Sequence, residues 1–291
     1  MKILLTGGSS FLGKKTLSLI SDSFNVIGTF NSKRSEKLIH LDLSDIAQIS
    51  KIFNEILPDV VLHLASITDL SICENNQEMA KIVNSIATLE LARMCDLNNA
   101  RMIYISSDYV FSGNDGPYDE HAKPGPLSYY GQSKLGGEEI LSILNNSVVC
   151  RIPILYGFND QDDKETFVSQ VLRKTDNKEK FRVDNHRIKY PVLIDDVAIF
   201  IKTLVESTET GIFHLSSKLP LTRYDWALKI AETFDIPATL IKKDDELEKD
   251  AFPPKPVDVD LLNTRHDFVF RSVDEGLRII KEQMGNKSHL N

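Results

Sequence analysis

The sequence predicts an α/β fold, a Rossmann-type doubly wound parallel sheet with a smaller C-terminal α/β lobe. Two observations predict it. Apolar runs of strand length alternate with amphipathic stretches of helix length through the first half of the chain. A Gly-rich turn, from Thr6 to Gly13, joins the first strand directly to the first helix. At 291 residues and 42% hydrophobic content, the chain has the composition of an ordinary globular protein.

Five short apolar runs are expected to form buried strands, because strands of a parallel sheet are apolar on both faces. These are Ile3–Leu5, Asn25–Phe30, Val60–Leu64, Met102–Ile105 and Val148–Ile152. Helices are expected between them at roughly Leu12–Ser21, Ser44–Leu57, Met79–Leu97 and Tyr129–Leu144. Right-handed crossovers then give a parallel sheet with helices on both faces.

The alternation weakens after Pro153, where further helices are indicated near Tyr224–Phe234 and Val273–Glu282. We therefore expect residues 1–153 to form a dinucleotide-binding Rossmann domain, completed by about residues 192–215. Residues 154–191 and 216–291 are expected to form the smaller, substrate-binding lobe.

Charge and composition exclude several classes of partner. The net charge of −8 argues against nucleic acid and anionic lipid, whose binding surfaces concentrate Lys and Arg. No C-x-x-C pair occurs among the three cysteines and no i, i+4 pair among the seven histidines, so no metal site is expected. No apolar stretch is long enough for a signal peptide or a membrane span, and we expect a cytoplasmic protein.

The Gly-rich turn predicts a phosphate site at a helix N-terminus. Gly7 would make the turn and Gly13 would allow close packing of helix and strand. Ser10 departs from this pattern, because a serine is costly where the backbone needs positive φ. The alternative is a tight turn without a ligand. The expected cofactor contacts here are Gly7, Ser9, Ser10, Phe11, Leu12 and Gly13.

The end of the second strand favours NADP(H) over NAD(H). Asn31, Lys33 and Arg34 follow this strand, where a site for NAD(H) would have a carboxylate to bind the ribose. The alternative is a solvated basic loop. Asp42 and Leu43 follow a third short strand, and Asp42 could accept a hydrogen bond from adenine or support the start of the next helix.

Tyr130 and Lys134 form a candidate catalytic pair at i, i+4 spacing on one helix face. An ammonium beside a phenol lowers the phenol pKa, which suits proton transfer with a carbonyl or carbinol. Ser107 ends a buried strand at the carboxyl edge of the sheet, where its hydroxyl could polarise that carbonyl. The alternatives are a surface Tyr–Lys pair and a capping serine.

Together, these motifs resemble the extended short-chain dehydrogenase/reductase family, and within it the dTDP-4-dehydrorhamnose reductase branch. The phrases Tyr104 to Gly113 and Tyr130 to Glu138 carry the likeness. It continues into the second lobe at Arg151 to Gly157, Asp184 to Pro191, Asp195 to Ala198 and Gly211 to Leu215.

The resemblance implies a triad of Ser107, Tyr130 and Lys134, with Asn84 steadying a proton-relay water. It implies NADPH-dependent reduction of a nucleotide-linked 4-keto-6-deoxy sugar, in a homodimer. Leu64, Ala65, Ser66, Tyr130 and Lys134 would contact the cofactor. The implied substrate contacts are Thr68, Glu74, Ser107, Tyr109, Val110, Phe111, Arg187 and Lys255.

Three departures keep alternatives open. Ser10 replaces a glycine of the fingerprint, Ser71 stands where the family commonly has Asp, and Lys255 precedes Pro256 where the family has Arg. A sugar-nucleotide epimerase or dehydratase on the same scaffold is one alternative. The other is a non-catalytic cofactor-binding subunit, resembling the regulatory subunit of methionine adenosyltransferase.

Overall fold

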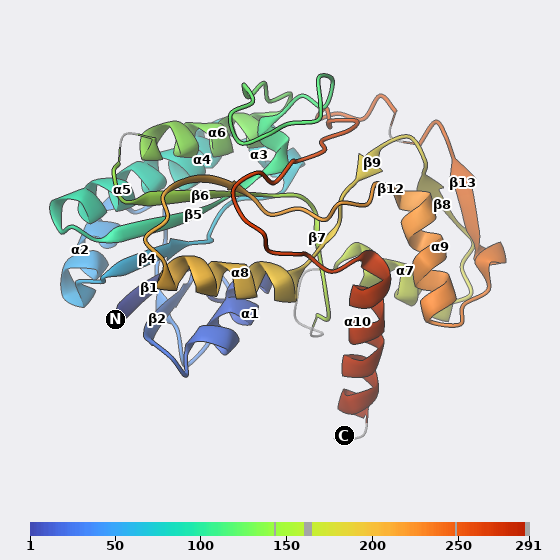
Figure 1. Ribbon diagram of the computed structural model, residues 1–291, viewed down its shortest axis with the longest axis horizontal. Coiled ribbons are helices and arrows are strands. Elements are labelled where there is room, and N and C mark those ends of the chain that lie inside the picture. Colours follow the sequence, from blue (N-terminus) through green and yellow to red (C-terminus); the bar gives the residue numbers. More distant parts are fainter. Residues whose placement is uncertain (143, 160–164, 248, 289–291) are drawn as a thin grey trace.

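A seven-stranded, wholly parallel sheet forms the centre of the computed structural model, which describes residues 1–142, 144–159, 165–247 and 249–288 (Figure 1). The strand order is β11-β6-β5-β4-β1-β2-β3. The strands are β1 (Lys2–Thr6), β2 (Asn25–Phe30), β3 (Ile39–His40), β4 (Val60–His63), β5 (Arg101–Ser107), β6 (Ser147–Ile152) and β11 (Gly211–His214). The predicted fold class and all five predicted strands are confirmed.

Helices cover both faces of this sheet, because alternate strand residues point to opposite sides. Ile3 and Leu5 belong to one buried cluster with side chains of α1 (Phe11–Ile20) and α8 (Ile194–Glu206). Leu4 belongs to the opposite cluster. That cluster includes side chains of α2 (Ile46–Ile56), α5 (Ala87–Leu97) and α6 (Tyr129–Leu141).

The predicted helix Met79–Leu97 is not one continuous α-helix, although its apolar pattern predicts one. The structure divides it into α4 (Gln77–Lys81), a π-helical turn η1 (Ile82–Ile86) and α5. The sequence analysis did not predict a further short helix, α3 (Leu70–Asn75), which Asp69 caps by accepting from the Ser71 and Ile72 N–H groups. Asn84 lies within this π-turn and its side chain is buried.

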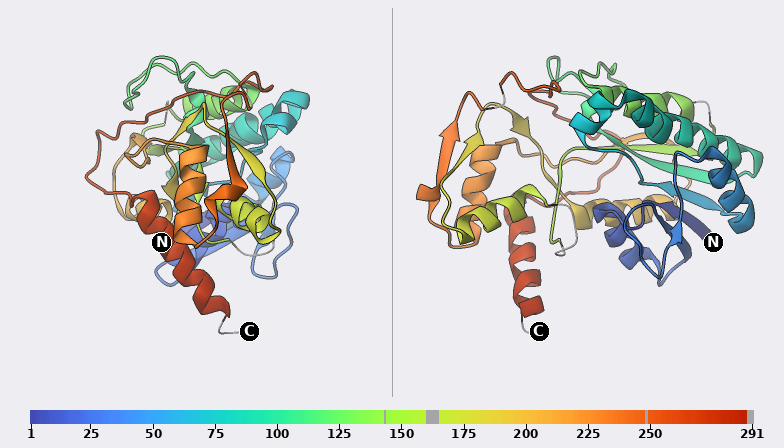
Figure 2. Two further views of the ribbon diagram at one scale, coloured as in Figure 1. Left: turned by 90° about the vertical axis from the view of Figure 1, so that its right-hand side faces the viewer. Right: turned by 180° about the vertical axis from the view of Figure 1, so that it is seen from behind.

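The second region lies to one side of the sheet (Figures 1 and 2). Its sheets are two-stranded: β7 (Leu155–Tyr156) with β10 (Val192–Leu193), β8 (Phe181–Asp184) with β13 (Ile241–Asp244), and β9 (Ile188–Lys189) with β12 (Leu221–Thr222). The helices are α7 (Phe167–Asp176), α9 (Arg223–Thr233) and α10 (Val273–Ser288). Trp226 is fully buried in the core that these elements share.

The end of α10 extends away from the rest of the molecule (Figure 2). Strand β11 returns from this half of the chain to pair with β6 at the edge of the large sheet. The division into 1–153 with 192–215, and 154–191 with 216–291, stays a prediction of how the chain divides into folding units.

Candidate active site

A cavity of about 1060 Å³ runs along the carboxyl edge of the sheet and is also lined by residues of the second region. Strands β1, β4 and β5 end at this edge of the sheet and pass into loops or short helices. The carboxyl ends of parallel strands are where open α/β sheets bind ligands. Residues from both halves of the chain therefore meet in one cavity.

The turn after β1 forms one end of this cavity. Gly7 has φ +75°, and a Cβ there would lie 2.9 Å from the Ala65 backbone, so both conformation and space require glycine. A Cβ at Gly13 would lie 2.0 Å from the Gly7 carbonyl oxygen, which explains the third glycine of the turn. Ser10 has φ −75° and its hydroxyl caps α1 by accepting from the Gly13 N–H at 3.1 Å. Ser10 therefore imposes no backbone strain.

The loops after β2 and β3 continue the cavity wall. Asn31 and Lys33 line it, whereas Arg34 is exposed outside the described wall. Asp42 also lines it, but its Oδ1 accepts from the Ser44 N–H at 2.8 Å and from the Ser44 hydroxyl at 2.7 Å. These bonds lower the pKa of Asp42 and engage one of its oxygens in the turn before α2.

Tyr130 lies in the first turn of α6, which Ser128 caps by accepting from the Gly131 N–H. Gly131 lets α6 lie close to the 3-10 helix η2 (Asp108–Val110), which follows β5, since a Cβ there would lie 2.2 Å from the Tyr109 carbonyl oxygen. Burial raises the pKa of Tyr130, while the nearby Ser107 hydroxyl acts in the opposite direction. The sequence analysis expected a lowered pKa, and that expectation is wrong for this cavity because loss of solvation outweighs nearby favourable contacts.

Lys134 is also buried beside the cavity, with Nζ 4.1 Å from the centre of the Tyr104 ring. Burial lowers the pKa of Lys134 to about 7, and the Glu138 carboxylate partly opposes this. Glu138 itself forms a buried ion pair with Arg151 of β6, at 2.7 Å, and accepts a hydrogen bond from Ser106. This network fixes the part of α6 that carries Lys134.

Asn84 joins the loop at Ile67 to Ser133 of α6 through hydrogen bonds behind the cavity. Its Oδ1 accepts from the Ile67 N–H at 2.8 Å and the Ser66 hydroxyl at 3.1 Å. Its Nδ2 donates to the Ile67 carbonyl at 3.0 Å and to the Ser133 hydroxyl at 2.9 Å. Because an amide side chain has two donor hydrogens and two acceptor lone pairs, these bonds use its full capacity.

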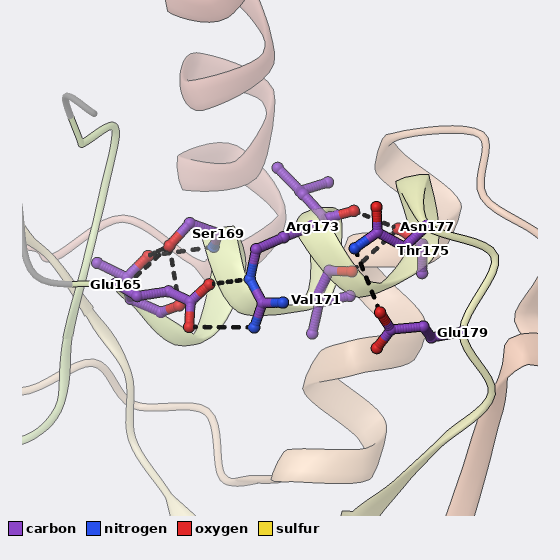
Figure 3. Close-up of polar contacts among 9 residues, drawn as sticks. Glu165, Ser169, Val171, Arg173, Thr175, Asn177 and Glu179 are labelled. Atoms are coloured by element: carbon purple, nitrogen blue, oxygen red, sulfur yellow. Dashed lines mark hydrogen bonds and ion pairs between the residues drawn. The ribbon is translucent and has the colours of Figure 1, made fainter.

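The second region supplies a basic wall that includes Arg187, Lys189, Arg223 and Lys255. Arg187 is buried and pairs with Asp184 at 3.4 Å. The cavity is also lined by residues at the start of α7, where Arg173 holds Glu165 through a 2.6 Å Nε–Oε1 hydrogen bond (Figure 3).

Most of the residues expected to bind ligand line this cavity. They are Gly7, Ser9, Ser10, Phe11, Leu12, Asn31, Lys33, Asp42, Leu43, Leu64, Ala65, Ser66, Thr68, Ser107, Tyr109, Tyr130, Lys134, Arg187 and Lys255. The others lie off the described wall: Gly13, Arg34, Glu74, Asn84, Val110 and Phe111. Glu74 instead accepts from the Tyr129 N–H, and Val110 and Phe111 belong to a small apolar core.

The sequence analysis missed several lining residues. Asp108 directly follows Ser107, and its position at a strand end is a signal that could have identified it. Lys189 lies in a two-residue strand, and Phe167 and Gln170 lie on α7. No periodic pattern marks these three positions as part of the cavity wall.

A family model described as "RmlD substrate binding domain" matches residues 1–274. The chain belongs to this family. The match confirms the resemblance inferred from the sequence and places the chain among reductase-like members of the extended short-chain dehydrogenase/reductase group.

Among solved structures, dTDP-4-dehydrorhamnose reductase from Bacillus anthracis, in complex with NADP, is similar with a TM-score of 0.86. Its sequence is 25% identical, over 97% of this chain and 99% of that one.

Two curated relatives are similar in sequence. Methionine adenosyltransferase 2 subunit beta from Xenopus tropicalis is 30% identical over 83% of this chain and 74% of its own length. A probable low-salt glycan biosynthesis reductase from Haloferax volcanii is 29% identical over 90% of this chain and 91% of its own.

Within the described residues, none of the helices is long and apolar enough to cross a membrane. No cluster of three or more His, Cys, Asp or Glu side chains in that part of the chain is arranged to hold a metal ion.

Proposed function

We propose that this chain is an NADPH-dependent reductase of a nucleotide-linked 4-keto-6-deoxy sugar. The observation that carries the proposal is one cavity lined by the Gly-rich turn, by Ser107, Tyr130 and Lys134, and by basic residues of the second region. The similar solved reductase in complex with NADP supports it.

The residues around the Gly-rich turn fit a dinucleotide. The close approach of Gly7 to Ala65 and the N-terminus of α1 at the cavity wall suit the binding of a diphosphate by backbone N–H groups. Lining residues Phe30 to Lys33 include no carboxylate, and Lys33 offers a positive charge to a 2′-phosphate. These features support NADP(H) over NAD(H).

The raised pKa of Tyr130 supports a role for its phenol as the proton donor in a carbonyl reduction. A nicotinamide cofactor supplies the hydride when it is bound. Tyr130 is a neutral phenol, because its pKa is raised, and would donate its proton to the substrate oxygen as that oxygen becomes an alkoxide. Ser107 would hydrogen-bond the same oxygen. Lys134 would hold the cofactor ribose and favour the phenolate left on Tyr130 when charged.

The basic wall suits the diphosphate of a sugar nucleotide. Arg187 and Lys255 would bind phosphate oxygens, with Thr68 and Tyr109 nearer the sugar. Lys255 cannot reproduce the two-pronged contact of an arginine, so the sugar and the nucleotide are left to experiment.

The test is to mix the purified protein with NADPH and dTDP-4-dehydrorhamnose and to follow nicotinamide absorbance. The proposal predicts oxidation of NADPH faster than of NADH, with stoichiometric reduction of the sugar. The proposal would be contradicted if the protein bound NADPH but oxidised it with none of a panel of 4-keto sugar nucleotides.

A second candidate function rests on the relatives named methionine adenosyltransferase 2 subunit beta. In this case the chain would bind NADP(H) and associate with a methionine adenosyltransferase catalytic subunit without reducing a sugar. Co-elution with that subunit on size exclusion, together with no sugar turnover, would favour this candidate. The cytoplasmic location and the homodimer stay predictions.

A further inference from the structure

His63 is a buried histidine that ends strand β4 behind the cavity. The parallel register of the sheet pairs it with Thr6, the last residue of β1. Its side chain lies off the described cavity wall. The segment that follows it, Leu64 to Ile67, does line the cavity, and so does Gly7, which follows Thr6. His63 therefore lies next to the ends of two strands whose following residues form part of the wall.

Both ring nitrogens of His63 have a buried partner. Nδ1 lies 2.7 Å from the Thr6 hydroxyl, and Nε2 lies 3.0 Å from the Thr88 hydroxyl of α5. The Thr6 hydroxyl also accepts from the Ala65 N–H at 3.3 Å. The Thr88 hydroxyl also donates to the Asn84 carbonyl oxygen at 2.9 Å. These polar groups form one continuous hydrogen-bonded chain from Ala65 to Asn84.

The hydroxyl protons determine which nitrogen of His63 carries the proton. A hydroxyl has one hydrogen, and that of Thr88 is used on the Asn84 carbonyl, which can only accept. Thr88 must therefore accept from the Nε2–H of His63. In a neutral imidazole the other nitrogen is then an acceptor, so Nδ1 takes the Thr6 proton. The Thr6 oxygen keeps its lone pairs for the Ala65 N–H, and the chain runs in one direction.

The surroundings keep the His63 ring neutral. Burial, and to a smaller degree the charge of Lys134, lowers the pKa of His63 to about 3. The ring stacks on Tyr104 with 5.5 Å between ring centres, and Lys134 Nζ lies 4.1 Å from the centre of the same Tyr104 ring. A doubly protonated imidazole could not accept from Thr6, so the chain requires the neutral form.

The chain joins two contacts that hold the cavity-lining segment. At one end, Thr6 holds the Ala65 N–H. Ala65 packs directly on the Gly-rich turn, because a Cβ at Gly7 would lie 2.9 Å from the Ala65 backbone. At the other end, the amide of Asn84 holds Ile67 through the N–H and the carbonyl of that residue. The contact between the segment and the turn therefore depends on the Thr6 hydroxyl, whose direction the imidazole sets.

We propose that His63 is a positioning residue for the cofactor: its Nε2–H form directs the Thr6 hydroxyl so that Ala65 stays against the Gly-rich turn. The proposal rests on the dinucleotide binding proposed above. His63 lies off the described cavity wall, so it acts on cofactor affinity through Thr6 and Ala65. The direction of the chain is set at α5, and the chain holds the segment in place at the turn.

The first test measures the position of the proton without cofactor. Long-range 1H–15N correlation of the imidazoles gives the tautomer, with the His63 signals assigned by their loss in His63→Asn. We expect one neutral form with the proton on Nε2, unchanged from about pH 8 to about pH 5, because its pKa lies below this interval. A proton on Nδ1, or titration within this interval, would overturn the proposal.

The second test separates the roles of the two nitrogens. His63→Asn carries its amide oxygen near the position of Nδ1 and can still accept from Thr6. His63→Gln carries its amide near the position of Nε2 and leaves the Thr6 proton without that acceptor. We expect both variants to lower the urea midpoint of unfolding, and His63→Gln to bind NADPH about tenfold more weakly than His63→Asn. Equal NADPH affinities in the two variants would contradict a positioning role.

Thr6 offers a milder pair of variants for the same question. Thr6→Ser keeps the hydroxyl and loses the methyl group, whereas Thr6→Val keeps the shape and loses the hydroxyl. We expect Thr6→Val to bind NADPH about tenfold more weakly than Thr6→Ser. NADPH titration, followed by fluorescence, measures both affinities, and equal values would again count against the proposal.

His121→Gln is the matched control for His63→Gln, since His121 is exposed and lies outside the described cavity wall. It should bind NADPH as the wild type does. If the wild type binds NADPH and the affinities are equal within each pair of variants, the positioning role alone is removed. If the wild type binds neither NADPH nor NADH, the dinucleotide binding on which the proposal rests is removed instead.

Discussion

The two walls of the cavity are built differently. The sheet wall carries Ser107, Tyr130 and Lys134 on a long strand and a capped helix, all buried and tied to a network of hydrogen bonds. The opposite wall comes from the two-residue strands β7 and β9 and from the start of α7. The difference teaches that the fold places the groups expected to do chemistry on long regular elements, and the groups expected to choose the substrate on short strands and connecting segments.

Gly13→Ala should have the largest effect on the sheet wall. Its Cβ would lie 2.0 Å from a backbone oxygen, so α1 must move away from β1. We expect a loss of about 1–3 kcal/mol or more in the free energy of unfolding, and loss of NADPH binding. Denaturant unfolding and NADPH titration measure both.

Gly125→Ala is the control, because a Cβ there meets no atom within 4 Å. An equal free energy of unfolding and an equal NADPH affinity in the two variants would show that the sheet wall is less rigid than the geometry implies.

Ile230→Ala tests whether the second wall has a core of its own. Ile230 is fully buried on α9, and truncation should cost about 2–5 kcal/mol. Trp226 is the sole tryptophan and lies in the same cluster, so its fluorescence follows urea unfolding of this region.

The exposed Glu232→Ala on the same helix should change stability by less than about 0.5 kcal/mol. If Ile230→Ala did not change the urea midpoint of unfolding, this cluster would contribute little to the stability of the second region.

Lys33→Ser is expected to have the smallest effect, because a single exposed cation contributes modestly. We expect the preference for NADPH over NADH to fall about tenfold, equivalent to ~1.4 kcal/mol. Arg34→Ser, outside the described wall, should leave the preference unchanged. Comparison of kcat/KM for the two cofactors measures this, and an equal fall in both variants would mean that Lys33 has no specific contact.

The contrast between the walls also explains what the sequence could predict. Buried strands and the Gly-rich turn have strong local patterns, so the sheet and the Tyr130–Lys134 face were predictable. The six-residue helix α3 and the π-turn at Asn84 were not, because neither is long enough to establish a period. Lys189 belongs to a two-residue strand, and only the fold brings it to the cavity that Asp108 also lines.

The raised pKa of Tyr130 also could not be predicted from the sequence. Spacing on a helix predicts which groups are near one another, and on that basis Lys134 was expected to lower the phenol pKa. Burial decides the direction instead, and burial depends on packing across the whole cavity.

The central claim is that the sheet wall does the chemistry and the second wall selects the substrate. The most direct measurement is the separation of kcat from KM for Tyr130→Phe and Lys255→Ala in one assay of NADPH oxidation with the sugar nucleotide. We predict that Tyr130→Phe lowers kcat about 10²- to 10⁴-fold with little change in KM, and that Lys255→Ala raises KM with little change in kcat. Tyr129→Phe, on the same helix but off the cavity wall, should match the wild type. A Tyr130→Phe variant with wild-type kcat would contradict the account.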